Sequence, residues 1–256
     1  MAKIPTGRFV WFEYSTKDAP KAQAFFGELF GWKSKTIDAP GSQYTMIALG
    51  DQTIGGYWPA PPPGAPQHAQ WISHLQVEDA TASAARAKEL GGQVMMEPMV
   101  VGDFGTFAVI KDPTGATLSL WQPEKHIGHA DYLGKPGAFV WNELTTDDPD
   151  RSLAFYRELG GFTVEPMNMG DMTYNVLNSG DKGRAGVIKT PMPGVPSAWT
   201  PYIQVDDADR IAERAKKMGA TLRVPPTDIP DVGRFAIIED PQGGVLGILK
   251  PSPRKD

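Results

Sequence analysis

The chain repeats itself, and this repeat constrains the fold more than any other feature of the sequence. Residues 9–32 and 139–162 are identical at 11 of 24 positions, at a constant offset of 130. Residues 71–123 and 199–251 share 21 of 53 positions at an offset of 128. Matches over most of a half-chain indicate a tandem duplication. The fold should therefore be two copies of one domain.

The length of 256 residues agrees with two domains of ordinary size. We expect them at residues 7–125 and 137–252, joined at 126–136 by a polar segment that contains glycine and proline, as linkers do. No apolar run approaches the ~20 residues needed to span a bilayer. The N-terminal residues show no apolar core of a secretory signal. We expect a soluble cytoplasmic protein, either a monomer or a homodimer.

Each half divides again into two similar modules. A short strand-like run ends in an aspartate suited to cap a helix, an amphipathic stretch follows, and a glycine suited to the left-handed position closes it. These stretches are Asp18–Gly31, Asp79–Gly91, Asp148–Gly161 and Asp207–Gly219. Three short strand-like runs follow each of them, and in the second module of each half a DPxG turn, at 112–115 and 240–243, precedes the last run. The pattern predicts four copies of a βαβββ unit.

Composition excludes several kinds of chemistry. The net charge of −5 argues against nucleic-acid binding and gives no support for docking on an anionic membrane. The chain has no cysteine, which excludes disulfides, thiolate metal sites and cysteine nucleophiles. Its four histidines all lie within the first 129 residues, so the second half has no histidine chemistry. Phosphate-binding glycine loops and the GxSxG nucleophile motif are also missing.

The duplicated βαβββ pattern resembles the vicinal-oxygen-chelate superfamily of glyoxalases, bleomycin resistance proteins and extradiol dioxygenases. The resemblance rests on Asp18 followed by Phe25 and Phe26, on Asp148 followed by Phe155 and Tyr156, and on the two DPxG turns. It covers nearly the whole chain and points to the tandem, glyoxalase-like branch. It implies an α+β fold in which four modules form two cupped, half-open mixed sheets with helices outside.

The same resemblance implies a divalent metal in each cup, held by side chains of the first and last strands of the modules. The matching positions, paired from the two halves, are Trp11 and Trp141, Ile72 and Thr200, and Ser119 and Gly247. Imidazole and carboxylate are the usual ligands of such a metal, and none of these positions carries one. We therefore expect no metal cofactor, although a displaced divalent metal stays open.

Strand alternation indicates where a displaced site would lie. Trp11 and Glu13 share one face of their strand, and His74 and Gln76 share one face of theirs, so both pairs can project into the first cup. The counterparts in the second cup are Trp141, Glu143, Tyr202 and Gln204. A histidine with one glutamate falls short of the three or more protein ligands of a stable metal site. Trp11 and Trp141 are compatible either with packing or with stacking on a ligand. Glu13 and Glu143 are compatible either with a role in the cavity or with a structural hydrogen bond.

These residues lead to three hypotheses. The first is a metal-independent protein that binds a small apolar or aromatic molecule in its cups. Its binding residues would be Trp11, His74, Gln76, Trp121, Trp141, Tyr202 and Gln204. The second is a glyoxalase-like lyase or isomerase in which Glu13 or Glu143 is the catalytic base, with or without a displaced metal. The third is an interaction scaffold in which one half is degenerate.

Overall fold

The computed structural model describes residues 6–39, 42–58, 68–125, 134–170, 172–190 and 194–253. Most of the linker expected at 126–136, including His126 and His129, lies outside the described residues, so the proposed domain boundaries stay a prediction. No helix in the described ranges is long and apolar enough to cross a membrane.

The described elements follow the βαβββ order four times. The helices are α1 (Ala19–Phe30), α2 (Ala80–Glu89), α3 (Pro149–Gly160) and α4 (Ala208–Lys217). The strands of the first half are β1 (Phe9–Ser15), β2 (Lys33–Ala39), β3 (Ser42–Leu49), β4 (Gln52–Trp58), β5 (Gln70–Gln76), β6 (Gln93–Val101), β7 (Gly105–Lys111) and β8 (Thr117–Pro123). Those of the second half are β9 (Phe139–Thr146), β10 (Thr163–Met169), β11 (Met172–Ser179), β12 (Lys182–Lys189), β13 (Ala198–Gln204), β14 (Thr221–Ile229), β15 (Gly233–Glu239) and β16 (Val245–Pro251).

The helices begin where the sequence predicts, because an aspartate caps each one. The side chain of Asp79 accepts a hydrogen bond from the backbone N–H three residues later at 2.8 Å, and that of Asp148 does so at 3.1 Å. Asp18 and Asp207 cap α1 and α4 in the same way. Such a cap stabilises a helix by about 1 kcal/mol. The paired aspartates before α3 and α4 are thus helix starts.

Each half of the chain forms one eight-stranded mixed sheet. The strand orders are β2-β3-β4-β1-β5-β8-β7-β6 and β10-β11-β12-β9-β13-β16-β15-β14. The two modules of a half join through their first strands, which pair antiparallel, while each first strand pairs in parallel with the last strand of its own module. This arrangement confirms the predicted α+β fold of two cupped sheets.

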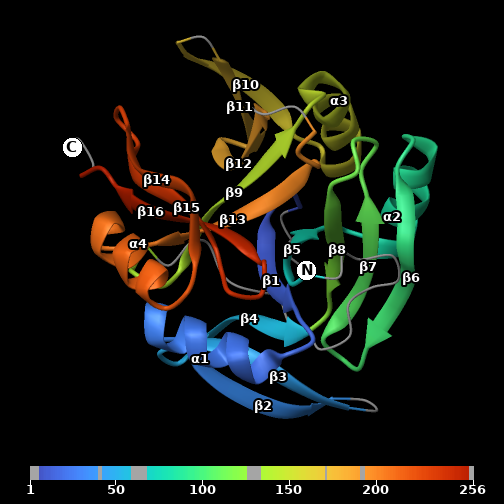
Figure 1. Cartoon of the computed structure of the whole chain (residues 1–256). Helices are drawn as coiled ribbons and strands as arrows, with labels where there is room; N and C mark the ends of the chain where they lie inside the picture. Colours follow the sequence, from blue (N-terminus) through green and yellow to red (C-terminus); the bar gives the residue numbers. More distant parts are fainter. Residues whose placement is uncertain are drawn as a thin grey trace.

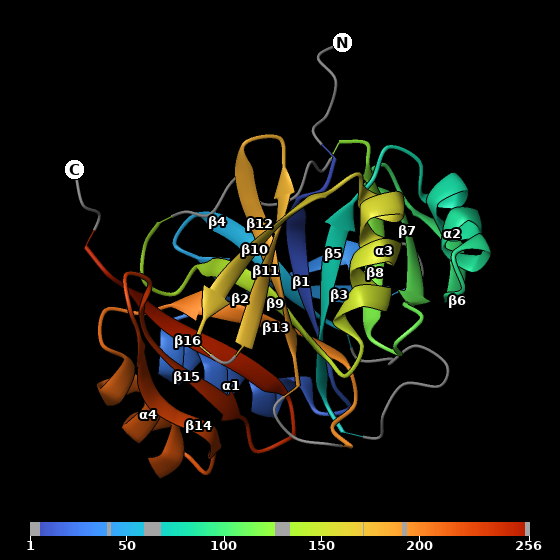
Figure 2. The same ribbon diagram turned by 90° about the horizontal axis from the view of Figure 1, so that it is seen from above.

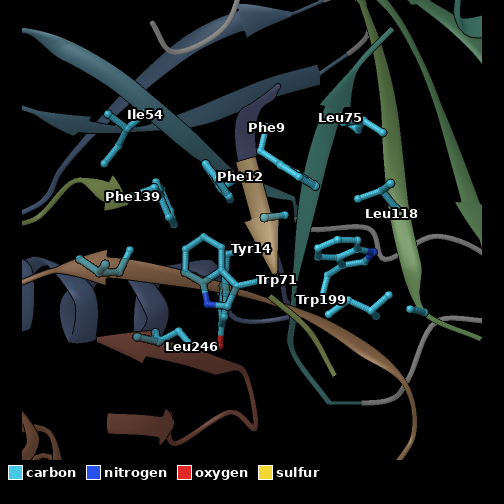
Figure 3. Close-up of a cluster of buried hydrophobic side chains, with 14 of the residues drawn as sticks. Phe9, Phe12, Tyr14, Ile54, Trp71, Leu75, Leu118, Phe139, Trp199 and Leu246 are labelled. Carbon is cyan, nitrogen blue, oxygen red and sulfur yellow. The ribbon is translucent and has the colours of Figure 1, made fainter. Parts of the chain in front are cut away.

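The two halves share one core on the outer faces of the sheets. Phe12 of β1 and Phe139 of β9 stack with their ring centroids 3.9 Å apart, and Trp71 of β5 packs against Phe139 (Figure 3). The Ser73 hydroxyl hydrogen bonds the Asn142 side chain at 3.0 Å across the same junction. Because β1 alternates, a residue such as Phe12 on this face leaves its neighbours Trp11 and Glu13 on the opposite, concave face.

The helices also meet across the halves. In Figure 1, α1 lies beside α4 and α2 beside α3, and Figure 2 shows the same pairs from above. Arg86 of α2 forms an ion pair with Glu158 of α3 at 2.9 Å, and Arg214 of α4 forms one with Glu28 of α1 at 3.6 Å. These two ion pairs occupy equivalent positions in the repeat. The halves are therefore related by an approximate two-fold symmetry.

Candidate functional site in the cups

The concave face of the first sheet carries a hydrogen-bonded group around a buried carboxyl. The Tyr44 hydroxyl on β3 donates to Oε1 of Glu13 on β1, and the Trp11 indole N–H donates to the Tyr44 oxygen at 3.0 Å. His74 on β5 places its Nε2 3.8 Å from Oε2 of Glu13. We call these four residues the first cup cluster. The structure thus brings together Glu13 and His74, as strand alternation predicts.

Burial controls the charges of this cluster. Burial raises the pKa of Glu13 from its ordinary 4.5 to about 7, against the opposing effect of the hydrogen bonds from Tyr44 and Trp11. Burial also lowers the pKa of His74 from 6.5 to about 3, so its imidazole is neutral at physiological pH. A neutral imidazole has one nitrogen that donates and one that accepts. The cluster therefore holds a proton near neutral pH without a permanent ion pair.

The second sheet carries a related group with one substitution. The Trp141 indole N–H donates to the Tyr174 hydroxyl at 2.7 Å, as in the first half. At the position of His74, however, Tyr202 donates its hydroxyl to Oε1 of Glu143 at 2.9 Å. Burial raises the pKa of Glu143, and hydrogen bonds from Tyr202 and Tyr174 oppose this rise. We call Trp141, Glu143, Tyr174 and Tyr202 the second cup cluster.

An aromatic and apolar wall lies beside the first cup cluster. Val10, Phe107, Val109 and Trp121 form a buried group, against which Trp58 packs. The His74 ring lies 6.3 Å from the Trp121 ring and 6.4 Å from that of Phe107, measured between centroids. Trp121 is thus in the first cup, as expected. Such a combination of apolar wall and few polar groups is typical of small-molecule sites.

Gln76 and Gln204 occupy the last positions of β5 and β13. Gln76 is 1% exposed and pairs in register with Trp121 on the neighbouring strand. Gln204 is half-buried, and within the described residues its side chain makes no hydrogen bond to Glu143 or Tyr202. The structure therefore brings Gln76 close to the first cup wall but does not join Gln204 to the second cup cluster.

Tyr44 and Tyr174 are the partners that sequence reasoning missed. A signal was present, because both tyrosines and two glycines, Gly56 and Gly186, recur at the offset of 130. A Cβ atom at Gly56 would overlap the Tyr44 hydroxyl, and one at Gly186 would overlap that of Tyr174. The glycines therefore make room for the tyrosines that bind the carboxyls. Only the strand pairing shows that each pair is in contact.

The residues of the cups do not fit the metal that the fold suggests. Trp11, Ile72 and Ser119 stand at the implied ligand positions, and the Trp11 N–H and the Ser119 hydroxyl both donate hydrogen bonds to protein oxygens. In the described part of the chain, no three histidine, aspartate or glutamate side chains come together as a metal site would require. Glu13 and His74 supply two donors at most. The first cup therefore has too few donors for a stable metal site.

A cavity of about 300 Å³ lies elsewhere, between α1 and the Asp240–Gln242 turn, with Met218, the residue that follows α4, in its lining. Its buried carboxyl, Asp240, already accepts a hydrogen bond from the Tyr14 hydroxyl at 2.6 Å. This cavity belongs to the junction of the two halves and does not contain the cup clusters.

Comparison with known proteins agrees with the fold. Residues 8–120 and 127–247 each match the Glyoxalase/Bleomycin resistance protein/Dioxygenase superfamily. The chain therefore belongs to this superfamily, with two such domains in tandem. It is 40% identical over 250 residues, 96% of this chain and 95% of the relative, to a protein of Mycobacterium tuberculosis named "Putative glyoxylase CFP32".

Other relatives extend the comparison. The chain is 29% identical to the anthracycline biosynthesis protein DnrV of Streptomyces peucetius, over 98% of this chain and 95% of that protein. Among solved structures, it resembles a Mn(II)-bound glyoxalase from Novosphingobium aromaticivorans, with a TM-score of 0.67, 17% identity and coverage of 96% of this chain and 82% of that one. The 2,3-dioxygenase LapB from a Pseudomonas species also has a TM-score of 0.67, at 12% identity, over 99% of this chain and 95% of that one. These structural similarities concern the fold alone.

Proposed function

We propose that this protein binds a small apolar or aromatic molecule in its cups without the help of a metal. The observation that carries the proposal is the first cup cluster: a buried carboxyl and a neutral imidazole lie together in the cup, and the indole of Trp11 occupies one of the implied metal-ligand positions. Aromatic side chains supply flat apolar surface, and a few polar groups fix orientation. This arrangement suits binding of a molecule of low charge.

The named relatives support an aromatic ligand. Two Streptomyces relatives, 29% and 30% identical to the chain, are named anthracycline biosynthesis proteins. Anthracyclines are flat polycyclic aromatic molecules, and a wall that includes Phe107 and Trp121 is chemically suited to such rings. We infer from these names only the class of ligand, because the side chains of the cup determine which molecule binds.

Tryptophan fluorescence tests the proposal. The first cup contains Trp11, Trp58 and Trp121, so an aromatic ligand there should quench emission. The protein would be titrated in EDTA with 2-naphthol, 2-quinolone and 1,4-dihydroxyanthraquinone. We expect saturable quenching by at least one compound, unchanged when Mn²⁺ or Ni²⁺ replaces EDTA. Absence of quenching by all three, or quenching that requires the metal, would overturn the proposal.

A second function is favoured by the position of Glu13, whose Oε2 lies 3.8 Å from Nε2 of His74 in the first cup and whose pKa burial raises to about 7. A general base works best when its pKa lies near the working pH. Glu13 could then move a proton in a lyase or isomerase reaction of the glyoxalase type. The test is turnover of 2-oxoaldehyde–thiol adducts in EDTA. Loss of turnover in Glu13→Gln but not in Glu143→Gln would assign the reaction to the first cup, and no turnover in the unaltered protein would reject it.

A further inference from the structure

The two cups differ at a pair of facing positions. Strand β5 pairs with β8 so that His74 faces Ser119, and β13 pairs with β16 so that Tyr202 faces Gly247. A Cβ atom at Gly247 would overlap the Tyr202 ring, so the glycine makes room for the larger side chain. The Tyr202 hydroxyl then satisfies the carboxyl of the second cup. The second cup cluster is therefore complete without a ligand.

The first cup is not complete in this way. Both ring nitrogens of His74 and both amide atoms of Gln76 are fully enclosed and have no hydrogen-bond partner among the described residues. His74 is 4% exposed and Gln76 is 1% exposed. Buried polar atoms in native proteins nearly always have partners, so four such atoms in one place require an explanation. Hydrogen bonds to a polar ligand would satisfy them.

These atoms face the aromatic wall. Gln76 and Trp121 are register partners on adjacent strands, and such partners project from the same face of a sheet. His74 lies against the Trp121 and Phe107 rings. Trp58 meets Phe107 edge to face, with centroids 5.9 Å apart, from the other side of the cup. The unpartnered atoms and the rings thus lie on the same face of the first sheet.

The second cup offers a poorer wall. By the repeat, Ile188 and Leu249 stand at the positions of Trp58 and Trp121. Phe235, the counterpart of Phe107, is half-buried, whereas Phe107 is buried. The second cup therefore has fewer rings to stack on a ligand, and the residues of its cluster are not among the described residues with buried, unpartnered polar side-chain atoms.

We propose that the first cup alone is the binding site, so that one chain holds one ligand, and that the ligand is a compact aromatic molecule with a hydrogen-bond donor and acceptor side by side on one edge. This rests on the proposed function. A primary amide such as that of Gln76 offers an N–H and a C=O in one plane, which match the C=O and N–H of a lactam in a cyclic pair. The neutral His74 adds one donor and one acceptor.

Isothermal titration calorimetry with 2-quinolone, an aromatic lactam, tests both parts of the proposal. In EDTA we expect saturable binding with one site per chain. N-methyl-2-quinolone, which lacks the N–H donor, should bind at least tenfold more weakly. Two sites per chain would overturn the one-cup assignment, and equal affinities would overturn the lactam edge. If other aromatic compounds quench tryptophan emission but 2-quinolone does not bind, the ligand class is wrong while the proposed function survives.

Two variants locate the site. Gln76→Leu should weaken 2-quinolone binding at least tenfold, and Phe235→Leu in the second cup should leave it unchanged. A purely structural glutamine would also lower the unfolding temperature when replaced, whereas loss of unpartnered polar atoms should not lower it. Unchanged affinity in Gln76→Leu, or weaker binding in Phe235→Leu, would contradict the proposal. Near-ultraviolet circular dichroism of both variants shows that each keeps its tertiary packing.

Discussion

At the scale of single residues, the glutamates at positions 13 and 143 are the least expected feature of the cups. An acidic side chain is rarely buried unless it has partners. Here Glu13 has Tyr44 as a hydrogen-bond donor, and Glu143 has Tyr202. Even so, burial raises both pKa values, so desolvation outweighs the hydrogen bonds. The protein tolerates this cost in both halves, which marks the two carboxyls as functional candidates.

The raised pKa of Glu13 predicts a pH dependence of stability. In the folded protein the carboxyl keeps its proton up to about pH 7, whereas in the unfolded chain it ionises near 4.5. The stabilisation is therefore complete below pH 4.5 and is lost as pH rises toward 7. At 1.36 kcal/mol per pH unit the loss is on the order of 3 kcal/mol. His74 acts in the opposite direction, because its lowered pKa favours the folded state as pH rises through 6.5. The Glu13 contribution is therefore measured by urea unfolding at pH 5 and pH 8 as the difference between the unaltered protein and a variant without the carboxyl.

Glu13→Gln is the control for this experiment, because glutamine does not titrate. The unfolding free energy at pH 5 minus that at pH 8 should be lower in Glu13→Gln than in the unaltered protein by about that amount. Equal pH dependence in the two proteins would show that Glu13 ionises normally in the fold.

At the scale of elements, the cups depend on a close approach between β3 and β4. Met46 pairs with Gly56, and the Tyr44 side chain passes over that glycine to reach Glu13. In the second half, Gly186 stands in the same relation to Tyr174. Two glycines thus position two hydroxyls, one in each cup.

Gly56→Ala should displace Tyr44 from Glu13, because the added Cβ would overlap the tyrosine hydroxyl. We expect a loss of stability of about 1–3 kcal/mol, the usual cost of overpacking. The cost should be smaller in a Tyr44→Ala background, since the clash is then absent. Thermal unfolding of the four proteins of this double-mutant cycle measures the coupling, and additive effects would contradict the proposed contact.

The helices and strands can be predicted from the sequence, whereas most side-chain contacts between them cannot. The capping aspartates, the closing glycines and the repeat predict the four modules, because each signal is local. Alternation places Glu13 and His74 in one cup, because both lie on first strands. The contact between Tyr44 and Glu13 was not predicted, because it depends on the register of β3 against β4. The sequence shows that Tyr202 stands at the position of His74, but it does not show that the Tyr202 hydroxyl donates a hydrogen bond to Glu143.

At the scale of the whole molecule, the halves are joined by buried hydrogen bonds as well as by apolar packing. The Tyr156 hydroxyl of α3 donates to Asp112 in the first half at 3.0 Å and accepts from the Trp199 indole at 2.8 Å. In the first half, Phe26 stands at the position of Tyr156 and has no hydroxyl. Asp240 instead accepts a hydrogen bond from the hydroxyl of Tyr14 on β1. The duplication has therefore kept the aspartates and changed their partners. The halves should unfold together.

Tyr156→Phe tests this junction. The change removes a buried hydroxyl, so that Oδ2 of Asp112 loses its donor and the Trp199 indole N–H loses its acceptor, which should cost about 1–3 kcal/mol. Tyr57→Phe is the matched control, because the Tyr57 hydroxyl has no hydrogen-bond partner among the described residues. Differential scanning calorimetry should show a single transition, lowered in Tyr156→Phe and nearly unchanged in Tyr57→Phe. Two separate transitions in the unaltered protein would show that the halves unfold independently.

We propose that a fold able to hold metals here binds an aromatic molecule without one. This is tested by calorimetric titration of the protein with 2-quinolone, once in EDTA and once in excess Mn²⁺. We expect one site per chain and the same affinity in both solutions. Binding that disappears in EDTA and returns with Mn²⁺ would contradict it.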